Sequence, residues 1–480
     1  MLSIFIAAPS TVKVGERFPI GVKICTHPYF VGASCYMYSH PVKSPYNSSP
    51  RGITYMDNVP TEWQGSIEIR GGEDYDGPER FVFDGRTSPF PGDKRPIARI
   101  EGLSFSKPGT KFIKILETKG GNTFISNPIR VLPGEPEERL FWADLHCQTF
   151  FSDGLRCPEE LHRFARDEAF LDVFALSDHS EALTDRQWDY FVAVTNDFNC
   201  PGRFVTLVGQ EWTSGKWGHR NAYFPGNCGP IWRCSDPKFS DLEDLYAAAR
   251  EHGALLIPHH SANVEMGVDW DNGYDPEVER LVEIYSIWGN SERPAREGNP
   301  RPIRVSGGER DGRHVVDALR RGYRFGIIGG GDIHDGRPGD ELHTLQRRPE
   351  SYRMLWRQGI AGIWARELTR EAIFEALWNR RVFATTNVRM FLKFSADGSP
   401  MGSEVKVDGE VRFLLEVASE VPIARIDLVK NGDDLHTEYP NVREVVCELN
   451  DDPGDGDWYY VRVIRTDGEM AWSSPIWIKK

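Results

Sequence analysis

Histidine and carboxylate residues recur in short groups along the middle of this 480-residue chain. The groups are Asp144 with His146, Asp178 with His179, Glu211, His259 with His260, and Asp332 with His334. Imidazole and carboxylate are the ligands that suit zinc, manganese and iron in proteins. A single buried histidine is usually a structural residue, but here the pattern returns five times. The sequence therefore predicts a metal centre.

Each group follows, or closes, a short apolar run that is typical of a buried strand. Helical segments fall between several of the runs: Pro158 opens one helix, Thr369 opens another, and Ser240-Asp-Leu-Glu243 predicts a capping box for a helix that Gly253 ends. Alternation of strands and helices predicts parallel strands, in an open sheet or a closed barrel, with the site at their carboxyl ends. The seven runs are Phe141–His146, Val173–His179, Phe204–Glu211, Ala254–His260, Leu281–Ser286, Phe325–His334 and Val382–Thr386.

Two groups have a spacing that places both side chains on one side of an extended chain. Asp332 and His334 are two residues apart, and so are His146 and Gln148. Alternate residues of a strand share a face, so each pair can point at the same centre. The glycines Gly329–Gly331 before the first pair let the backbone approach a ligand closely.

Three assignments stay open at this level. Asp153 stands in Ser152-Asp-Gly154, where it is either a turn residue or a ligand. Only one of His259 and His260 is expected to point inward, because neighbours on a strand alternate. Glu283 is a ligand, an acceptor that orients a ligand, or a core carboxylate with a partner.

The two flanks have a β pattern. Runs such as Phe18–Cys25 in the first flank, and Glu410–Val417, Ala424–Val429 and Trp458–Ile464 in the second, favour strands separated by glycine and proline turns. We therefore predict an N-terminal β-rich domain at residues 1–138, a strand–helix domain at 139–388, and a C-terminal β-sandwich domain at 389–480.

Composition excludes several classes of function. The net charge of −14 argues against a protein that grips nucleic acid through phosphates. No apolar run approaches the roughly 20 residues that span a membrane, and the start lacks the basic region of a signal peptide. None of the 8 cysteines has CxxC spacing, so we expect reduced thiols and a cytoplasmic protein rather than a cysteine-based zinc ribbon.

Between Phe141 and Thr386 the motifs resemble those of the PHP (polymerase and histidinol phosphatase) superfamily of metal-dependent hydrolases. The flanking β regions, with Gly218-His-Arg-Asn221 and Ala384-Thr-Thr386, resemble the DUF3604 branch. The motifs that carry the resemblance are Asp144-Leu-His-Cys-Gln-Thr149, Ser152-Asp-Gly154, Leu176-Ser-Asp-His179, Val208-Gly-Gln-Glu211, Ile257-Pro-His-His260 and Gly331-Asp-Ile-His334.

The resemblance implies a distorted (β/α)7 TIM-like barrel, flanked by β-sandwich-like domains, that holds two or three metal ions. Asp144 and Asp178 would orient the ligands at the catalytic centre. The family has a second histidine in its first motif where this chain has Gln148, so we expect two divalent ions, of zinc, manganese or iron. The implied ligands are His146, Asp153, His179, Glu211, His259 or His260, Asp332 and His334.

These ions predict a hydrolase, because a bound metal lowers the pKa of water to roughly 7. PHP enzymes mostly cleave phosphoesters, so a small phosphoester leads as substrate; an amide, lactone or carboxylic ester is the alternative. Arg220 and Arg337 follow strand ends and could bind an anionic group, as Gln148 could bind substrate. His219 or His343 could protonate the leaving group. A non-catalytic binding protein that keeps the barrel is a third reading, and the oligomeric state stays open.

Overall fold

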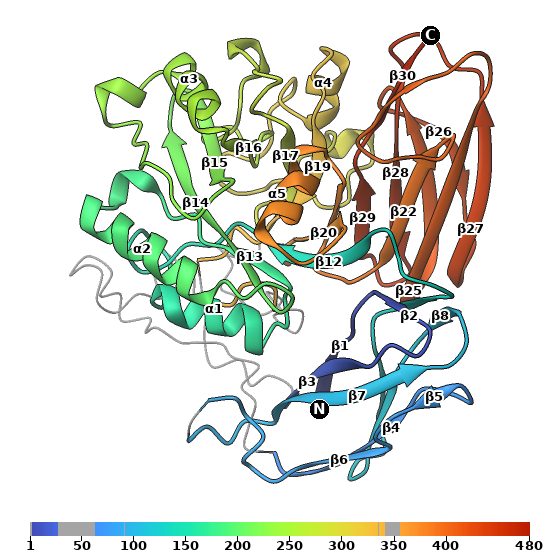
Figure 1. The fold of residues 1–480 in the computed structure, drawn as a ribbon. Coiled ribbons are helices and arrows are strands. Elements are labelled where there is room, and N and C mark those ends of the chain that lie inside the picture. Colours follow the sequence, from blue (N-terminus) through green and yellow to red (C-terminus); the bar gives the residue numbers. More distant parts are fainter. Residues whose placement is uncertain (1, 27–62, 91, 335, 341–355) are drawn as a thin grey trace.

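The computed structural model describes residues 2–26, 63–90, 92–334, 336–340 and 356–480. His343 and Cys35 therefore lie outside the described residues. The N-terminal strands lie below the middle region in Figure 1, and the C-terminal strands stand beside it. In the described part of the chain, no helix is long and apolar enough to cross a membrane.

Between Leu2 and Leu132 the described regular elements are strands, in agreement with the β-rich pattern. They form three small sheets, ordered β1-β3-β7-β5, β10-β9-β4-β6 and β2-β11-β8. The strands are β1 (Leu2–Ala7), β2 (Thr11–Lys13), β3 (Phe18–Thr26), β4 (Gly65–Arg70), β5 (Tyr75–Asp76), β6 (Arg80–Phe83), β7 (Ile97–Phe105), β8 (Gly109–Lys111), β9 (Lys114–Glu117), β10 (Thr123–Ile125) and β11 (Ile129–Leu132).

The middle region is a mixed α/β structure. Its main strands follow the order β16-β15-β14-β13-β12-β20-β21, and β18-β17-β19 form a separate sheet. The strands are β12 (Arg139–Asp144), β13 (Val173–Ala175), β14 (Val205–Ser214), β15 (Gly218–Phe224), β16 (Leu255–Pro258), β17 (Leu281–Ser286), β18 (Gly289–Asn290), β19 (Gly326–Gly329), β20 (Ile360–Ala365) and β21 (Val382–Thr385). Among these described strands the hydrogen bonds do not close into a ring, so a closed (β/α)7 barrel is not confirmed.

The expectation of parallel strands throughout is wrong for three strands that the sequence did not reveal, one of which, β18, is antiparallel to β17. β15 is antiparallel to both β14 and β16, and β20 is antiparallel to β12 and β21. β14 ends at Ser214 and β15 begins at Gly218, and so short a link allows only a hairpin, because a parallel crossover needs about a dozen residues. The pairs β12–β13, β13–β14 and β17–β19 are parallel, as expected.

Helices cover the outer side of the middle sheet, and α1, α2 and α3 lie on the side away from the C-terminal strands (Figure 1). Pro158 opens α1 and Thr369 caps α5 as predicted, but the cap of α3 is Asp241 rather than Ser240. Gly253 ends α3 with a φ of 59°, which a residue without a Cβ adopts freely. The α-helices are α1 (Pro158–Asp167), α2 (Asp185–Phe198), α3 (Leu242–His252), α4 (Val315–Arg320) and α5 (Arg370–Trp378), and the 3₁₀ turns are Ser180–Ala182, Pro237–Phe239, Trp270–Asn272 and Ala295–Glu297.

The C-terminal strands continue the middle sheet instead of starting a separate one. β21 pairs with β29, which joins both regions in one sheet of 16 strands. The two predicted strands on either side of residue 420 are one long strand, β25, whose register shifts where they were expected to separate. The division into domains at 138/139 and 388/389 stays a prediction. The strands are β22 (Phe391–Ala396), β23 (Ser399–Pro400), β24 (Glu404–Lys406), β25 (Val411–Lys430), β26 (Asp433–Glu438), β27 (Val442–Asp451), β28 (Trp458–Arg465), β29 (Met470–Ser473) and β30 (Ile476–Lys479).

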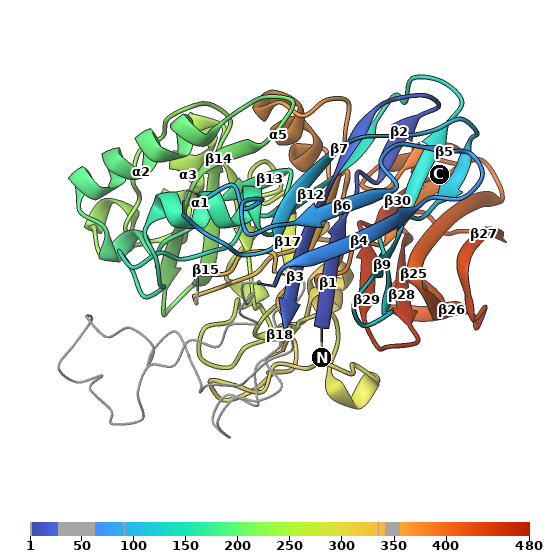
Figure 2. The same ribbon diagram turned by 90° about the horizontal axis from the view of Figure 1, so that it is seen from below.

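The face of the N-terminal sheet that meets the middle region is set by alternation along β3. Ile20, Val22 and Ile24 point into the N-terminal core. The residues between them point the other way, and the place that a Cβ of Gly21 would take is filled by the ring of Phe170. Figure 2 shows these N-terminal strands lying across the middle region. The two regions are therefore packed directly on each other.

Candidate metal centre

Three groups of side chains that could hold a metal ion gather at one edge of the middle strands, which is the carboxyl end of most of them but the amino end of the antiparallel β15. In each group the candidate ligand atoms lie within 4.8 Å of one another. The groups are His146 with His259 and Asp332, Asp153 with His179 and His334, and His219 with His259 and His260. Seven of the eight residues that we expected as ligands belong to these groups.

The eighth, Glu211, lies between the three groups and touches all of them. Its Oε1 is 2.8 Å from His219 Nδ1 and 3.3 Å from the nearest nitrogens of His179 and His259. Its Oε2 is 3.5 Å from His146 Nε2. Burial acts to raise the pKa of Glu211, but His179 and His259 outweigh it, and the net result is a pKa well below the ordinary value. Glu211 therefore remains a carboxylate at the centre of the site.

The first group is deeply buried and has polar atoms without partners. His146 Nε2 lies 3.3 Å from Asp332 Oδ1, while His146 Nδ1 is hydrogen-bonded to Glu283 Oε2 at 3.0 Å. In the part of the chain that the structure describes, His146 Nε2, both nitrogens of His259 and Asp332 Oδ2 are buried without a hydrogen-bond partner. Unsatisfied buried polar atoms are costly, and a cation would bind one nitrogen of each imidazole together with the carboxylate. The donor set thus fits a divalent metal.

The second group is closer to solvent and its imidazoles are fixed from behind. His179 Nε2 and His334 Nε2 each lie 3.4 Å from Asp153 Oδ1. His334 Nδ1 donates to the carbonyl of Asp332 at 3.0 Å. Thr213 donates to Glu211, so its oxygen accepts from His179 Nδ1 at 2.5 Å.

The ring of His146 is held in the same way as the rings of His179 and His334, because its Nδ1 donates a hydrogen bond to Glu283. In each ring Nδ1 is used as a donor, which leaves Nε2 turned toward a group. Metal-binding histidines are usually oriented in this way. Glu283 is accordingly placed to orient a ligand, one of the three roles that the sequence left open.

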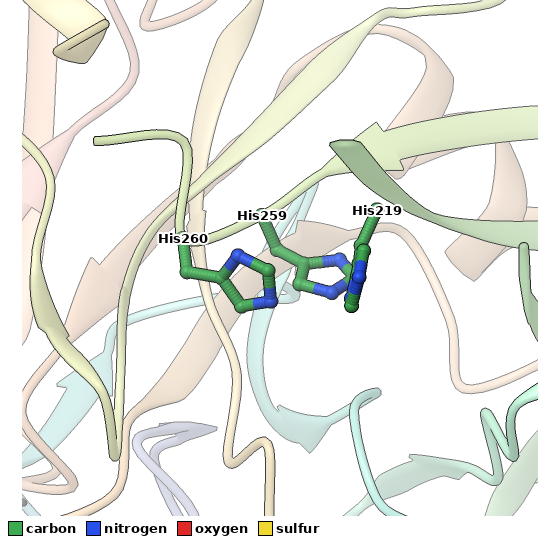
Figure 3. A group of neighbouring side chains, drawn as sticks. All are labelled: His219, His259 and His260. Atoms are coloured by element: carbon green, nitrogen blue, oxygen red, sulfur yellow. The ribbon is translucent and has the colours of Figure 1, made fainter. Parts of the chain in front are cut away.

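The third group corrects the expectation that only one of two neighbouring histidines points inward. His259 and His260 both approach His219, with ring centroids 5.7 and 4.9 Å from it (Figure 3). β16 ends at Pro258, and His260 has a φ of 34°, so strand alternation no longer applies there. Burial, with the charge of His146, lowers the pKa of His259 to about 3.

His219 was expected only as a proton donor, but it also belongs to a candidate ligand group. The sequence did not indicate this second role because the strand that carries His219, β15, was not predicted. Its polar start, Gly218-His-Arg-Asn221, does not look like a buried strand.

Asp178 holds the loop that carries Asp153. Its Oδ1 accepts hydrogen bonds from the hydroxyls of Thr149 and Ser152, both at 2.8 Å, and from the Ser152 amide at 3.1 Å. Both of its oxygens also accept from the amide of Thr149. Asp178 therefore fixes the loop that carries Asp153.

Asp144 has a similar role for the first group. Its Oδ1 accepts from the amides of Gly331 at 2.8 Å and His146 at 3.2 Å. A Cβ at Gly331 would lie 2.5 Å from Asp144 Oδ2, and a Cβ at Gly330 would lie 2.0 Å from Glu283 Oε2. The glycines thus allow close approach, as predicted, but to two carboxylates that orient the site.

Gln148 faces the centre. Its Nε2 donates to Glu211 Oε2 at 3.0 Å, and its Oε1 is buried without a hydrogen-bond partner among the described residues. The amide therefore lies beside Glu211, among the candidate ligands.

The structure does not bring the two expected anion-binding arginines into these groups. Arg220 Nε donates to Glu279 Oε1 at 2.5 Å and its Nη1 to the carbonyl of Trp217. As the strand neighbour of His219, it faces the other side of β15. Arg337 is buried in an ion pair with Asp340. Both guanidinium groups are thus used in the protein interior, and the expectation of substrate contact gains no support.

The family model with the description "Protein of unknown function (DUF3604)" matches residues 154–293 and 318–405. An uncharacterized protein of Chlamydia muridarum (strain MoPn / Nigg) is 31% identical over 406 residues, and one of Chlamydia pneumoniae is 30% identical over 402 residues. Each match covers 79% of this chain, which spans 63% of the length of these relatives.

Among solved structures, a two-domain protein of Bacteroides vulgatus containing a predicted PHP-like metal-dependent phosphoesterase is 17% identical, with 71% of this chain and 97% of that chain covered. Its TM-score of 0.36 is too low to support an argument. The family model covers the candidate ligands from His179 to His334, whereas His146 and Asp153 lie before the first matched residue. Over the matched residues this chain is similar to the DUF3604 family.

Proposed function

We propose that this protein is a metal-dependent hydrolase of the PHP type, and that it acts on a small phosphoester. The observation that carries the proposal is the convergence of the three groups on Glu211, with buried ring nitrogens and carboxylate oxygens that have no hydrogen-bond partner among the described residues. The PHP motifs of the sequence point to the same chemistry.

Two divalent ions, of zinc, manganese or iron, would occupy the centre. One would be held by His146, His259 and Asp332, and the other by Asp153, His179 and His334, with Glu211 shared between them. When bound, such ions supply Lewis acidity and lower the pKa of a water molecule to roughly 7. The third group, with His219 and His260, offers a further or alternative position.

Residues of the chain itself would orient the metal ligands and protonate the leaving group. Glu283 fixes the ring of His146, and Asp178 fixes the loop of Asp153. His219 is held by Glu211 at 2.8 Å and its side chain keeps 10% of its exposure, so it can pass a proton to a leaving group if it is not itself a ligand.

We also propose that the middle region is a distorted barrel of the PHP type. β17 lies beside β16, and β19 lies beside β20 and β21. Side-by-side packing at these two seams would complete the ring that the hydrogen bonds leave open.

A second candidate is the hydrolysis of a carboxylic ester, lactone or amide. It is favoured by the positions of Arg220 and Arg337, which are engaged in buried pairs and so do not offer the expected clamp for a phosphate. Metal-assisted attack by water serves both classes of substrate.

The test is a hydrolysis panel with protein supplied with Mn²⁺ or Zn²⁺. p-Nitrophenyl phosphate and bis-p-nitrophenyl phosphate represent phosphoesters, and p-nitrophenyl acetate represents carboxylic esters. We expect metal-dependent turnover of a phosphoester that Asp332→Ala abolishes. Turnover of the acetate alone would favour the second candidate, and metal binding without any turnover would favour a non-catalytic binding protein.

A further inference from the structure

We propose that Lys23, in the N-terminal sheet, is a positioning residue for the metal centre in the middle region. It would act through Asp340 and Asp144 on the backbone that carries His146. This inference rests on the proposed function, since it assumes that the centre binds metal. The N-terminal region would then help to position the metal ligands, in addition to packing against the middle region.

The first observation is a charged pair buried between two regions. Lys23 Nζ lies 3.0 Å from Asp340 Oδ1, and the two side chains are 2% and 0% exposed. They are 317 residues apart in the sequence. Lys23 stands on the same face of β3 as Gly21, which receives the ring of Phe170, and its Nζ also lies 5.0 Å from the centre of the Phe164 ring. Lysine is rarely buried completely unless it is paired, so this position is specific to its partner.

The second observation is that Asp340 belongs to a tightly held turn. Its other oxygen pairs with Arg337. Gln358 spans the same turn, donating to the carbonyl of Arg337 at 3.0 Å and accepting from the amide of Gly339 at 3.0 Å. The ion pair of Lys23 thus fixes one end of the turn at residues 337–340.

The third observation connects this turn to the ligands. The amide of Gly339 also donates to Asp144 Oδ2 at 3.2 Å. The other oxygen of Asp144 accepts from the amides of Gly331 and His146. Both oxygens of one buried carboxylate therefore join the turn to the strand ends that carry His146 and Asp332. A shift of the turn would be transmitted to the first candidate metal position.

Co²⁺ titration, followed by absorption spectroscopy, tests this link, together with thermal unfolding in the presence and absence of Co²⁺. The variant is Lys23→Met in the full chain. Partners that orient metal ligands typically contribute on the order of 10-fold to 100-fold in affinity, so we expect Lys23→Met to weaken Co²⁺ binding by about 10-fold. The rise in Tm that Co²⁺ produces should shrink accordingly, because stabilisation by a ligand follows its affinity.

Two further variants make the test specific. Lys13→Met removes an exposed pair with Glu135 and is the matched control, for which Co²⁺ affinity should not change. Lys23→Arg keeps the charge and should retain most of the Co²⁺ affinity. If Lys23→Met does not fold, Lys23→Gln is the second variant, because its neutral side chain removes the Lys23 charge while Asp340 keeps its pair with Arg337. Lys23→Gln should fold and show weakened Co²⁺ binding.

A lower Tm without Co²⁺, combined with unchanged Co²⁺ affinity and spectrum, would overturn the proposal and leave Lys23 as a stabilising residue only. Wild-type protein that does not bind Co²⁺ would overturn the proposed function itself, and this inference with it. The two failures are therefore distinguishable in one titration series.

Discussion

Two regions of this molecule bury many charged groups, and they differ in how those groups are satisfied. At the junction of the middle and C-terminal regions, Arg462 donates to Glu292 at 2.7 Å and lies 2.9 Å from Asp427. Glu292 also accepts from Tyr460 at 2.6 Å and Trp472 at 2.8 Å, so both of its oxygens are used.

The candidate metal centre is equally buried, but it has an excess of acceptors. In the described residues the atoms that lack a hydrogen-bond partner there include His146 Nε2, both nitrogens of His259 and Asp332 Oδ2. In a structural ion cluster the charged groups neutralise one another. In a metal-binding site the ligand atoms lack protein partners and are available to the ion. Burial alone therefore does not distinguish an ion cluster from a metal centre. The number of buried polar atoms that lack a hydrogen-bond partner does distinguish them.

The largest expected effect comes from the residue that joins the three groups. Glu211→Gln removes one negative charge and one ligand atom while it keeps the shape. We expect the hydrolysis rate to fall by roughly 10³-fold, which is about 4 kcal/mol of transition-state stabilisation. The measurement is kcat/KM on the best substrate of the panel. A rate within a factor of about 3 of the wild type would remove Glu211 from the mechanism.

The opposite pattern, a loss of stability without a loss of activity, is expected for the ion cluster around Arg462 and Glu292. Glu292→Gln removes one of the carboxylates around buried Arg462, which stays paired with Asp427 and Asp434, and losing a hydrogen bond to a charged group costs about 1.5–3 kcal/mol of unfolding free energy. Denaturant unfolding should show this loss, while metal content and kcat stay at wild-type levels in the folded fraction. Loss of metal from this variant would show that the two regions are not independent.

A buried histidine whose Nε2 has no hydrogen-bond partner among the described residues provides a sharper version of the comparison. His162 is buried, its Nδ1 donates to the carbonyl of Pro158, and burial lowers its pKa to about 4. The folded chain keeps this ring neutral, while the unfolded chain protonates it below about pH 6.5. Its contribution is present above pH 6.5 and is lost as the pH falls toward 4, by about 2 kcal/mol at pH 5.

His162→Gln should remove that part of the pH dependence. The measurement compares the Tm at pH 7 and pH 5 for both proteins without added metal. An identical drop in Tm in the wild type and the variant would contradict the assignment. His162 belongs to none of the candidate ligand groups in the described residues, so we expect that it does not bind metal.

The smallest effect is expected at Gln148. A Gln148→His variant would place an imidazole beside Glu211 and restore the pattern of the PHP motif. If the glutamine is only a weaker ligand, metal affinity should rise by roughly tenfold, about 1.4 kcal/mol, and turnover should be equal or higher. If the amide is needed for the substrate, occupancy should rise and turnover should fall. Unchanged occupancy and turnover would mean that residue 148 does not act in the site.

The sequence predicted much of this organisation because the ligands follow apolar runs that are easy to recognise. The strand at Phe204–Glu211 and the cap of α5 at Thr369 are examples in which local pattern and structure agree. The antiparallel β15 was missed because its first residues are polar and face a buried polar centre, where the usual apolar pattern is replaced by ligands.

Other features depend on contacts that are remote in the sequence. His260 points inward only because the chain leaves β16 with a positive φ. Arg220 looked like an anion-binding residue, but its partner, Glu279, is 59 residues away. The link from Lys23 to Asp340 crosses 317 residues, and no local pattern indicates it.

Metal content tests most directly whether the three converging groups form a metal centre. Protein purified without chelators, and then supplied in turn with Mn²⁺, Zn²⁺ and Fe²⁺, should retain about two ions per chain after removal of free metal, as measured by elemental mass spectrometry. Asp332→Ala should lose at least one of these ions and remain folded, whereas Glu292→Gln should keep both. A wild-type protein that retains none of the three metals, or an Asp332→Ala variant with unchanged stoichiometry, would contradict the account.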